Sequence, residues 1–153
     1  MALYLVQHGK SLPEDIDPEL GLSDEGRAEV ERIAAVAAGY AVPVAAIAHS
    51  GKKRALQTAE ILAAALNAAG RLSERSGLKP LDDVARFAAQ VRSPENLMLV
   101  GHLPFMEKLT AYLVTGNADV TVFKFQNGGI VCLEEDAAKG SWFITWALMP
   151  HIG

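Results

Sequence analysis

The sequence contains a single cysteine and no long apolar run. With Cys132 alone, the chain can form no internal disulfide, and a zinc site built on cysteine is not expected. No stretch is long enough to span a bilayer, and the first residues, MALYLVQHGK, carry no basic leader and too short an apolar run for a signal peptide. These absences lead us to expect a cytoplasmic protein in a reducing environment.

The charge is not strongly biased toward either sign. The net charge is −4, which gives the chain no electrostatic reason to bind nucleic acid or an anionic membrane. Half of the 153 residues are apolar and 21% are charged, as is typical of globular proteins. Without repeats, low-complexity tracts or a linker-like stretch, residues 1–153 are expected to form one domain.

Short apolar runs alternate with segments of helical periodicity along the chain. This alternation predicts an α/β fold of three layers, α/β/α, with a mostly parallel sheet and helices on both faces. The Asn127-Gly128-Gly129 tripeptide predicts a hairpin turn, so the C-terminal part should add an antiparallel hairpin. The predicted strands are 3–6, 44–48, 96–100, 120–125, 130–134 and 142–148, and the predicted helices are 23–39, 53–68, 80–91 and 104–114.

Three of the four histidines lie within two residues of the end of a predicted strand. They are His8, His49 and His102. Ligands of open parallel sheets bind beyond the carboxyl ends of the strands, so these side chains are expected to share one crevice. His49 is interpreted as a structural partner of its loop.

The sequence around these histidines resembles a known family. LVQHGKS resembles the Leu-x-x-Arg-His-Gly motif of the histidine phosphatase (phosphoglycerate mutase-like) superfamily. SGKKRALQTAEIL resembles its Ser-Pro-x-x-Arg-Ala-x-Gln-Thr-Ala block, and VGHLPFM resembles its Val-Gly-His-Asn-Pro block. The short length and the lack of a long insertion point to the SixA-like phosphohistidine phosphatase branch. The resemblance implies a phosphoglycerate mutase-like fold.

The resemblance also implies roles for individual residues. His8 matches the nucleophile that becomes phosphorylated, while Arg54 and His102 match the groups that contact the phosphoryl oxygens. A planar arginine and a protonated histidine can stabilise the charge of a transferring phosphoryl group. Gly9 leaves room for substrate beside the nucleophile, and Thr58 is placed to orient Arg54 or simply to pack. No metal or cofactor is expected.

Gln7 departs from the family pattern, in which an arginine occupies this position. Glutamine can donate hydrogen bonds to a phosphoryl group but carries no charge. Lys10 or Lys52 could supply the missing charge, although both are expected to be solvated. No carboxylate can be assigned as the proton donor, and Asp82 and Asp83, which lie in a plausible region, are interpreted as helix-capping residues.

These observations predict a phosphatase that removes a phosphoryl group from protein phosphohistidine through a phosphorylated His8. The partner would be a phosphorylated protein, such as a histidine domain of a phosphorelay, or a small phosphorylated substrate. Two alternatives remain open. One is a phosphatase of small phosphomonoesters, and the other, suggested by Gln7, is a non-catalytic module that binds phosphate or phosphohistidine.

Overall fold

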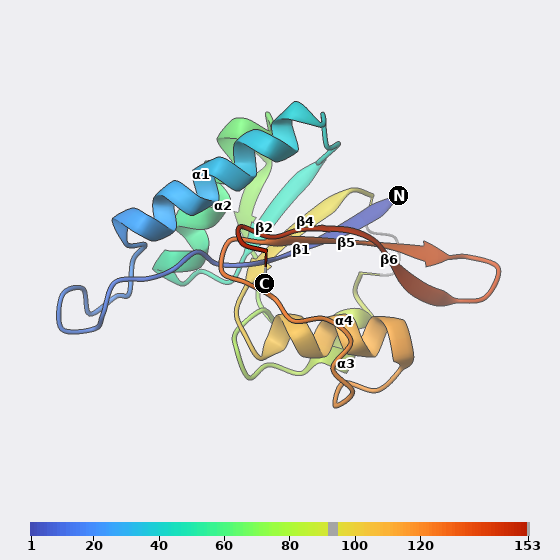
Figure 1. Cartoon of the computed structure of the whole chain (residues 1–153). Coiled ribbons are helices and arrows are strands. Elements are labelled where there is room, and N and C mark those ends of the chain that lie inside the picture. Colours follow the sequence, from blue (N-terminus) through green and yellow to red (C-terminus); the bar gives the residue numbers. More distant parts are fainter. Residues whose placement is uncertain (92–94, 153) are drawn as a thin grey trace.

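The computed structural model describes residues 1–91 and 95–152. Within them the chain forms a six-stranded sheet (Figure 1). Its strands are β1 (Ala2–Gln7), β2 (Ala46–His49), β3 (Leu72–Glu74), β4 (Leu97–Gly101), β5 (Ile130–Asp136) and β6 (Ser141–Leu148). Their order is β3-β2-β4-β1-β5-β6; the first four run parallel, and β5 and β6 run antiparallel to their neighbours. The predicted fold class is therefore confirmed.

The helices cover both faces of this sheet, as Figure 1 shows. They are α1 (Asp24–Gly39), α2 (Lys53–Ala65), α3 (Val84–Ala88) and α4 (Phe105–Thr115). Alternate residues of β1 enter the two cores: Tyr4 and Val6 pack with α1 and α2, whereas Leu3 and Leu5 pack with α3 and α4. Because both faces are covered, every residue of β1 is buried.

The predicted start of α1 is confirmed. Ser23 caps the helix, with its hydroxyl oxygen accepting a hydrogen bond from Gly26 N at 3.0 Å. Asp24 and Glu25 lie in the first turn, where carboxylates favour the positive end of the helix dipole. This start packs closely on the loop that follows β1, because Gly26 lies directly against the backbone of Lys10.

The hairpin predicted at Asn127-Gly128-Gly129 is wrong. Residues 120–125 form no strand, and the antiparallel hairpin joins β5 to β6 instead. Both favoured types of two-residue hairpin turn need a positive φ at the first central residue, yet Asn127 has none, and the positive φ of 81° falls on Gly128. The position beside β5 is already taken by β1, and Phe125 N donates to the Glu107 carboxylate rather than to a strand.

Three other segments also differ from prediction. The helix predicted over 80–91 is limited to α3, and Asp83 caps it rather than Asp82, whose carboxylate accepts from Lys79 N instead. α2 ends at Ala65, three residues before the predicted end. The edge strand β3 was not predicted, because three residues are too few to show a period.

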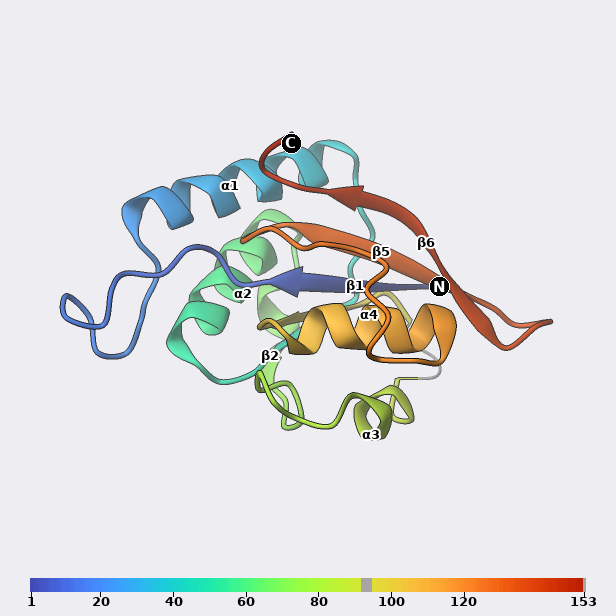
Figure 2. The same cartoon turned by 60° about the horizontal axis from the view of Figure 1, so that its bottom comes forward.

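Two segments project from opposite ends of the molecule (Figure 2). The loop between β1 and α1 extends from the end where β1 finishes, and the tip of the β5–β6 hairpin extends from the other end. The loop is fastened to the body by Lys53 Nζ, which contacts the Asp17 carboxylate at 2.8 Å. In the part of the chain described, no helix is long and apolar enough to cross a membrane.

Candidate functional site

The carboxyl ends of the four parallel strands meet at one edge of the sheet. The register pairs Gln7 with Gly101 and pairs His49 with both Val100 and Glu74. This alignment brings the segments that follow β1, β2 and β4 together, although they are far apart in sequence. It is the reason that His8, Arg54 and His102 come close to one another.

The His8 ring is held by hydrogen bonds at both nitrogens. Its Nδ1 lies 2.6 Å from the Gly9 carbonyl oxygen, which can only accept, so Nδ1 carries the proton. The other nitrogen, Nε2, therefore has a free lone pair, and Arg54 Nε donates to it at 3.3 Å. The nitrogen available as a nucleophile thus lies next to the arginine.

His8 is neutral at physiological pH. Burial lowers the pKa of His8 to about 4; the hydrogen bond to Gly9 opposes this shift, and the positive charge of Arg54 adds to it. A neutral imidazole keeps its lone pair, which a protonated one has lost. The environment therefore keeps His8 in its nucleophilic form across the physiological range.

His102 lies beside His8, with 5.0 Å between the ring centroids. It is fully buried, and its Nε2 lies 2.6 Å from the Ser50 hydroxyl. Burial, together with the nearby His8, Arg54 and Lys52, lowers the pKa of His102 to about 3. The expectation of a protonated histidine is not met in these surroundings. A bound phosphoryl dianion would favour the charged form and raise this pKa.

Arg54 lies in the first turn of α2, whose start is unusually basic. Three consecutive basic residues, Lys52, Lys53 and Arg54, surround the positive end of the helix dipole, which is unfavourable without an anion. No side chain caps this helix, and its first turn contains no acidic residue. The start of α2 therefore has the charge and the backbone donors that suit an anion.

Gln7 is buried where the family pattern has an arginine. Only 8% of it is exposed, and among the described residues nothing hydrogen-bonds to its Oε1. Lys10 does not replace the missing charge, because its Nζ contacts the Glu25 carboxylate at 2.8 Å. Lys52 is close enough to affect the pKa of His102 and is therefore the better placed of the two lysines.

Two polar residues at this edge were not identified from the sequence. Ser50 bonds to His102, and Glu74 ends β3 with its carboxylate against Gly51. Ser50 directly follows His49, so its position after a strand was a usable signal. Glu74 offered no such signal in the sequence, because β3, the strand that it ends, was not predicted. His49 has the structural role expected of it, since its Nδ1 accepts from Gly51 N at 3.1 Å.

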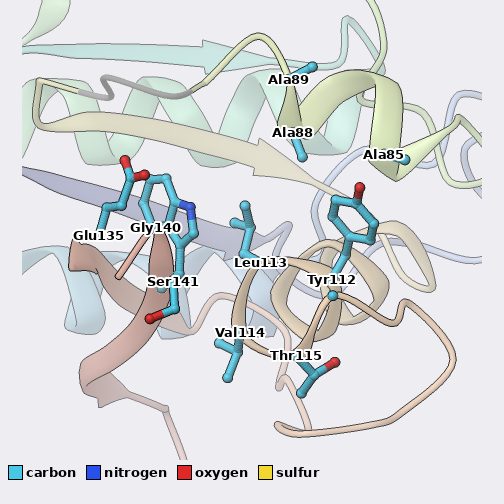
Figure 3. A pocket seen from close by; sticks show the side chains of 12 residues that line it. Ala85, Ala88, Ala89, Tyr112, Leu113, Val114, Thr115, Glu135, Gly140 and Ser141 are labelled. Carbon is cyan, nitrogen blue, oxygen red and sulfur yellow. The ribbon is translucent and has the colours of Figure 1, made fainter. Parts of the chain in front are cut away.

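A hollow of about 560 Å³ lies away from these residues, between α3, α4 and the β5–β6 hairpin (Figure 3). Its lining mixes small apolar residues with polar ones, has Glu135 as its carboxylate, and includes no histidine, arginine or lysine. The chemistry-bearing side chains gather instead at the carboxyl edge of the sheet. Among the described residues, no group of three or more histidine, cysteine or acidic side chains is arranged to hold a metal ion.

The fold and the histidines at its carboxyl edge define an α/β protein with a histidine-centred site. The chain belongs to the histidine phosphatase superfamily, since the model of its branch 1 matches residues 3–82, more than half of the sequence. A comparison with curated proteins found no match.

Solved structures of this superfamily resemble the chain over nearly its whole length. The protein histidine phosphatase SixA in complex with tungstate shares 24% identity and a TM-score of 0.85, over 98% of this chain and 97% of that one. A mycobacterial glucosyl-3-phosphoglycerate phosphatase shares 16% identity and a TM-score of 0.75, over 97% and 99%. A phosphoserine phosphatase mutant from Entamoeba histolytica shares 15% and 0.71, over 98% of each chain. At these identities the likeness establishes the fold.

Proposed function

We propose that the protein is a phosphohistidine phosphatase that works through a phosphorylated His8. The observation that carries this proposal is the state of the His8 ring. Its proton is on Nδ1, its pKa is far below the ordinary range, and its unprotonated Nε2 accepts a hydrogen bond from Arg54. A neutral nucleophile next to a guanidinium suits attack on an anionic phosphoryl group.

The reaction has two steps. His8 Nε2 attacks phosphorus, the bond from phosphorus to the substrate nitrogen breaks, and that nitrogen takes up a proton. Water then attacks the phosphorus on His8, the bond to Nε2 breaks, and inorganic phosphate leaves. In both steps Arg54, His102 and the start of α2 would bind the phosphoryl oxygens and offset their charge.

Two features favour phosphohistidine as the substrate. The structure is similar to SixA, a protein histidine phosphatase that was solved with tungstate, a tetrahedral oxyanion of the shape of phosphate. A phosphorus–nitrogen bond is also more labile than a phosphate ester, so its cleavage depends less on a strong acid. The partner would then be a phosphorylated protein, and residues 1–153 would act as a single domain.

Phosphate monoesters are a second candidate class, and one observation favours them. Ester cleavage needs a proton for the leaving oxygen. Glu74 offers a carboxylate at the carboxyl end of β3, on the same edge as His49 and next to the loop that leads to Arg54. Two of the similar structures are of phosphatases that act on small molecules, by their descriptions.

The test compares the wild-type protein with His8→Ala. Both are incubated with phosphoramidate, with a protein phosphorylated chemically on histidine, and with p-nitrophenyl phosphate. The wild type should release phosphate from the first two faster than from the ester. It should also carry a phosphoryl label that acid removes and alkali does not. His8→Ala should lose both turnover and label while its circular dichroism spectrum is unchanged.

The alternative outcomes separate the candidates. Faster turnover of the ester would favour the monoester class. Phosphate binding without turnover of any substrate would leave the non-catalytic binding module as the function. Full activity in His8→Ala would exclude His8 as the nucleophile.

A further inference from the structure

The backbone on the N-terminal side of His8 is held at both polar atoms. In the peptide unit between Gln7 and His8, the His8 N–H donates to the Gly101 carbonyl of β4 at 3.0 Å. The Gln7 carbonyl accepts from Gly128 N at 2.9 Å. The first bond continues the sheet, whereas the second comes from the loop that precedes β5. This loop contains the Asn127-Gly128-Gly129 tripeptide that forms no hairpin.

The next peptide unit, between His8 and Gly9, is also held at both ends, but by side chains. Its carbonyl oxygen accepts from Asn127 Nδ2 at 3.0 Å. Its N–H donates to Thr58 Oγ1 at 2.9 Å. Thr58 is fully buried, and its hydroxyl in turn donates to the Arg54 carbonyl at 2.8 Å. One hydroxyl therefore links the backbone beside His8 to the helix turn that carries Arg54.

The backbone at Gly9 needs such restraint. A Cβ at this position would lie 2.7 Å from Val30 Cγ2 and 3.2 Å from the Gly26 carbonyl oxygen, so only glycine fits without displacing its neighbours. Glycine leaves φ and ψ freer than any other residue does. The carbonyl of this same glycine accepts from His8 Nδ1. If the backbone turned here, the ring would lose the acceptor that fixes its tautomer.

We propose that Asn127 and Thr58 are positioning residues for His8. By holding the peptide unit between His8 and Gly9 at both ends, they keep the Gly9 carbonyl aimed at Nδ1 and leave Nε2 as the nucleophile beside Arg54. Neither side chain has to touch the substrate. The expectation that these two residues affect turnover rests on the proposed function. The expectation that they fix the orientation and the tautomer of the His8 ring does not.

Loss of either side chain should lower kcat more than it changes KM. Arg54, His102 and the start of α2 remain in place to bind the phosphoryl group, so KM should stay within about three-fold. Outer groups that orient a metal-binding histidine are commonly worth a factor of about 10 to 100, and we apply the same scale to a nucleophilic one. The two side-chain hydrogen bonds to this peptide unit, from Asn127 and to Thr58, form a clamp on it. We therefore expect kcat to fall by roughly that factor when either bond of the clamp is removed.

The first pair of variants tests Asn127. Asn127→Ala removes the donor to the His8 carbonyl. Gln126→Ala is the matched control from the same loop, since its amide exchanges two hydrogen bonds with the His151 backbone, at 2.9 and 3.0 Å, and none with His8. If the clamp holds, only Asn127→Ala loses kcat. An equal loss in Gln126→Ala would assign the effect to the loop as a whole and overturn the role of Asn127.

The second pair tests Thr58 without changing shape. Thr58→Val removes the hydroxyl, and Thr58→Ser retains it and should keep most of the activity. Thr110→Val is the matched control, because buried Thr110 makes the same bond within its own helix, to the Met106 carbonyl at 2.8 Å, and its hydroxyl has no hydrogen bond to the backbone around His8. Wild-type kcat in Thr58→Val would overturn the proposal at this end of the clamp.

A readout independent of turnover is the tautomer of His8, measured by long-range proton–nitrogen NMR at pH 7 with histidine labelled by ¹⁵N. The wild type, Gln126→Ala and Thr110→Val should show a single Nδ1–H form, and Asn127→Ala and Thr58→Val a mixture of tautomers. An unchanged tautomer in both site variants would refute the clamp. Should the wild type turn over no substrate, the proposed function fails, and this spectrum alone decides the positioning role.

Discussion

Gln7 is the residue at which the site departs most from the pattern of its superfamily. Its buried side-chain oxygen, Oε1, lacks a partner among the described residues, and the side chain brings no charge to the phosphoryl group. Gln7→Arg should therefore raise kcat/KM ten-fold or more, equivalent to about 1.4 kcal/mol of transition-state stabilisation. Steady-state hydrolysis of phosphoramidate measures the gain. Gln7→Lys is the control, since it adds charge without the two-pronged geometry and should gain less. No gain in either variant would show that Lys52 already serves this position.

The sequence was sufficient to predict that His8 and His102 come together, because both follow strands of a parallel sheet, whereas Arg54 was assigned to the site by the resemblance to the family. The protonation states of His8 and His102 could not be predicted from the sequence. The pKa values of about 4 and about 3 for His8 and His102 arise from burial and from neighbours distant in sequence, and neither can be read along the chain. The positioning role proposed for Asn127 was hidden for a related reason. Its tripeptide has the composition of a hairpin turn, but tertiary packing uses it otherwise.

Periodicity predicted the long elements and misjudged the short ones. The helices α1, α2 and α4 and the strands β1, β2, β4 and β6 occur close to their predicted positions, because each buries one face or both. Residues 120–125 have strand-like composition, yet they cannot form a hairpin with β5, because β1 and β6 already occupy both of its sides. Pairing of this kind depends on the whole sheet and leaves no local signal in six residues.

The contact between α1 and the loop after β1 gives a prediction at the level of an element. A Cβ on Gly26 would lie 2.1 Å from the Lys10 carbonyl oxygen, and backbone cannot swing aside as a side chain can. Gly26→Ala should thus lower the free energy of unfolding by about 2 kcal/mol, as overpacked positions do. The matched control is Gly39→Ala in the same helix, where the new methyl group would meet nothing within 4 Å. This control should raise the stability by about 0.5 kcal/mol through helix propensity. Urea unfolding measures both, and equal effects would contradict the proposed packing.

For the whole molecule, two neutral histidines in the core make stability depend on pH. The pKa values of His8 and His102 are lowered to about 4 and about 3, from 6.5 in the unfolded chain. Below pH 6.5 the unfolded chain therefore binds protons that the folded protein does not. The stabilising contribution is fully present above pH 6.5 and is lost as the pH falls, by about 1.4 kcal/mol per pH unit for each histidine.

The wild type should accordingly lose stability steeply between pH 6.5 and 5, as measured by urea unfolding at a series of pH values. His8→Gln and His102→Gln should each flatten this dependence by about 1.4 kcal/mol per pH unit, since glutamine has no proton to bind. Acidic residues that titrate in the same range are common to all three proteins, so their effect cancels in the difference between the curves. If both variants keep the slope of the wild type, the two rings are protonated in the folded protein, and the neutral nucleophile on which the proposed mechanism depends does not exist at that pH.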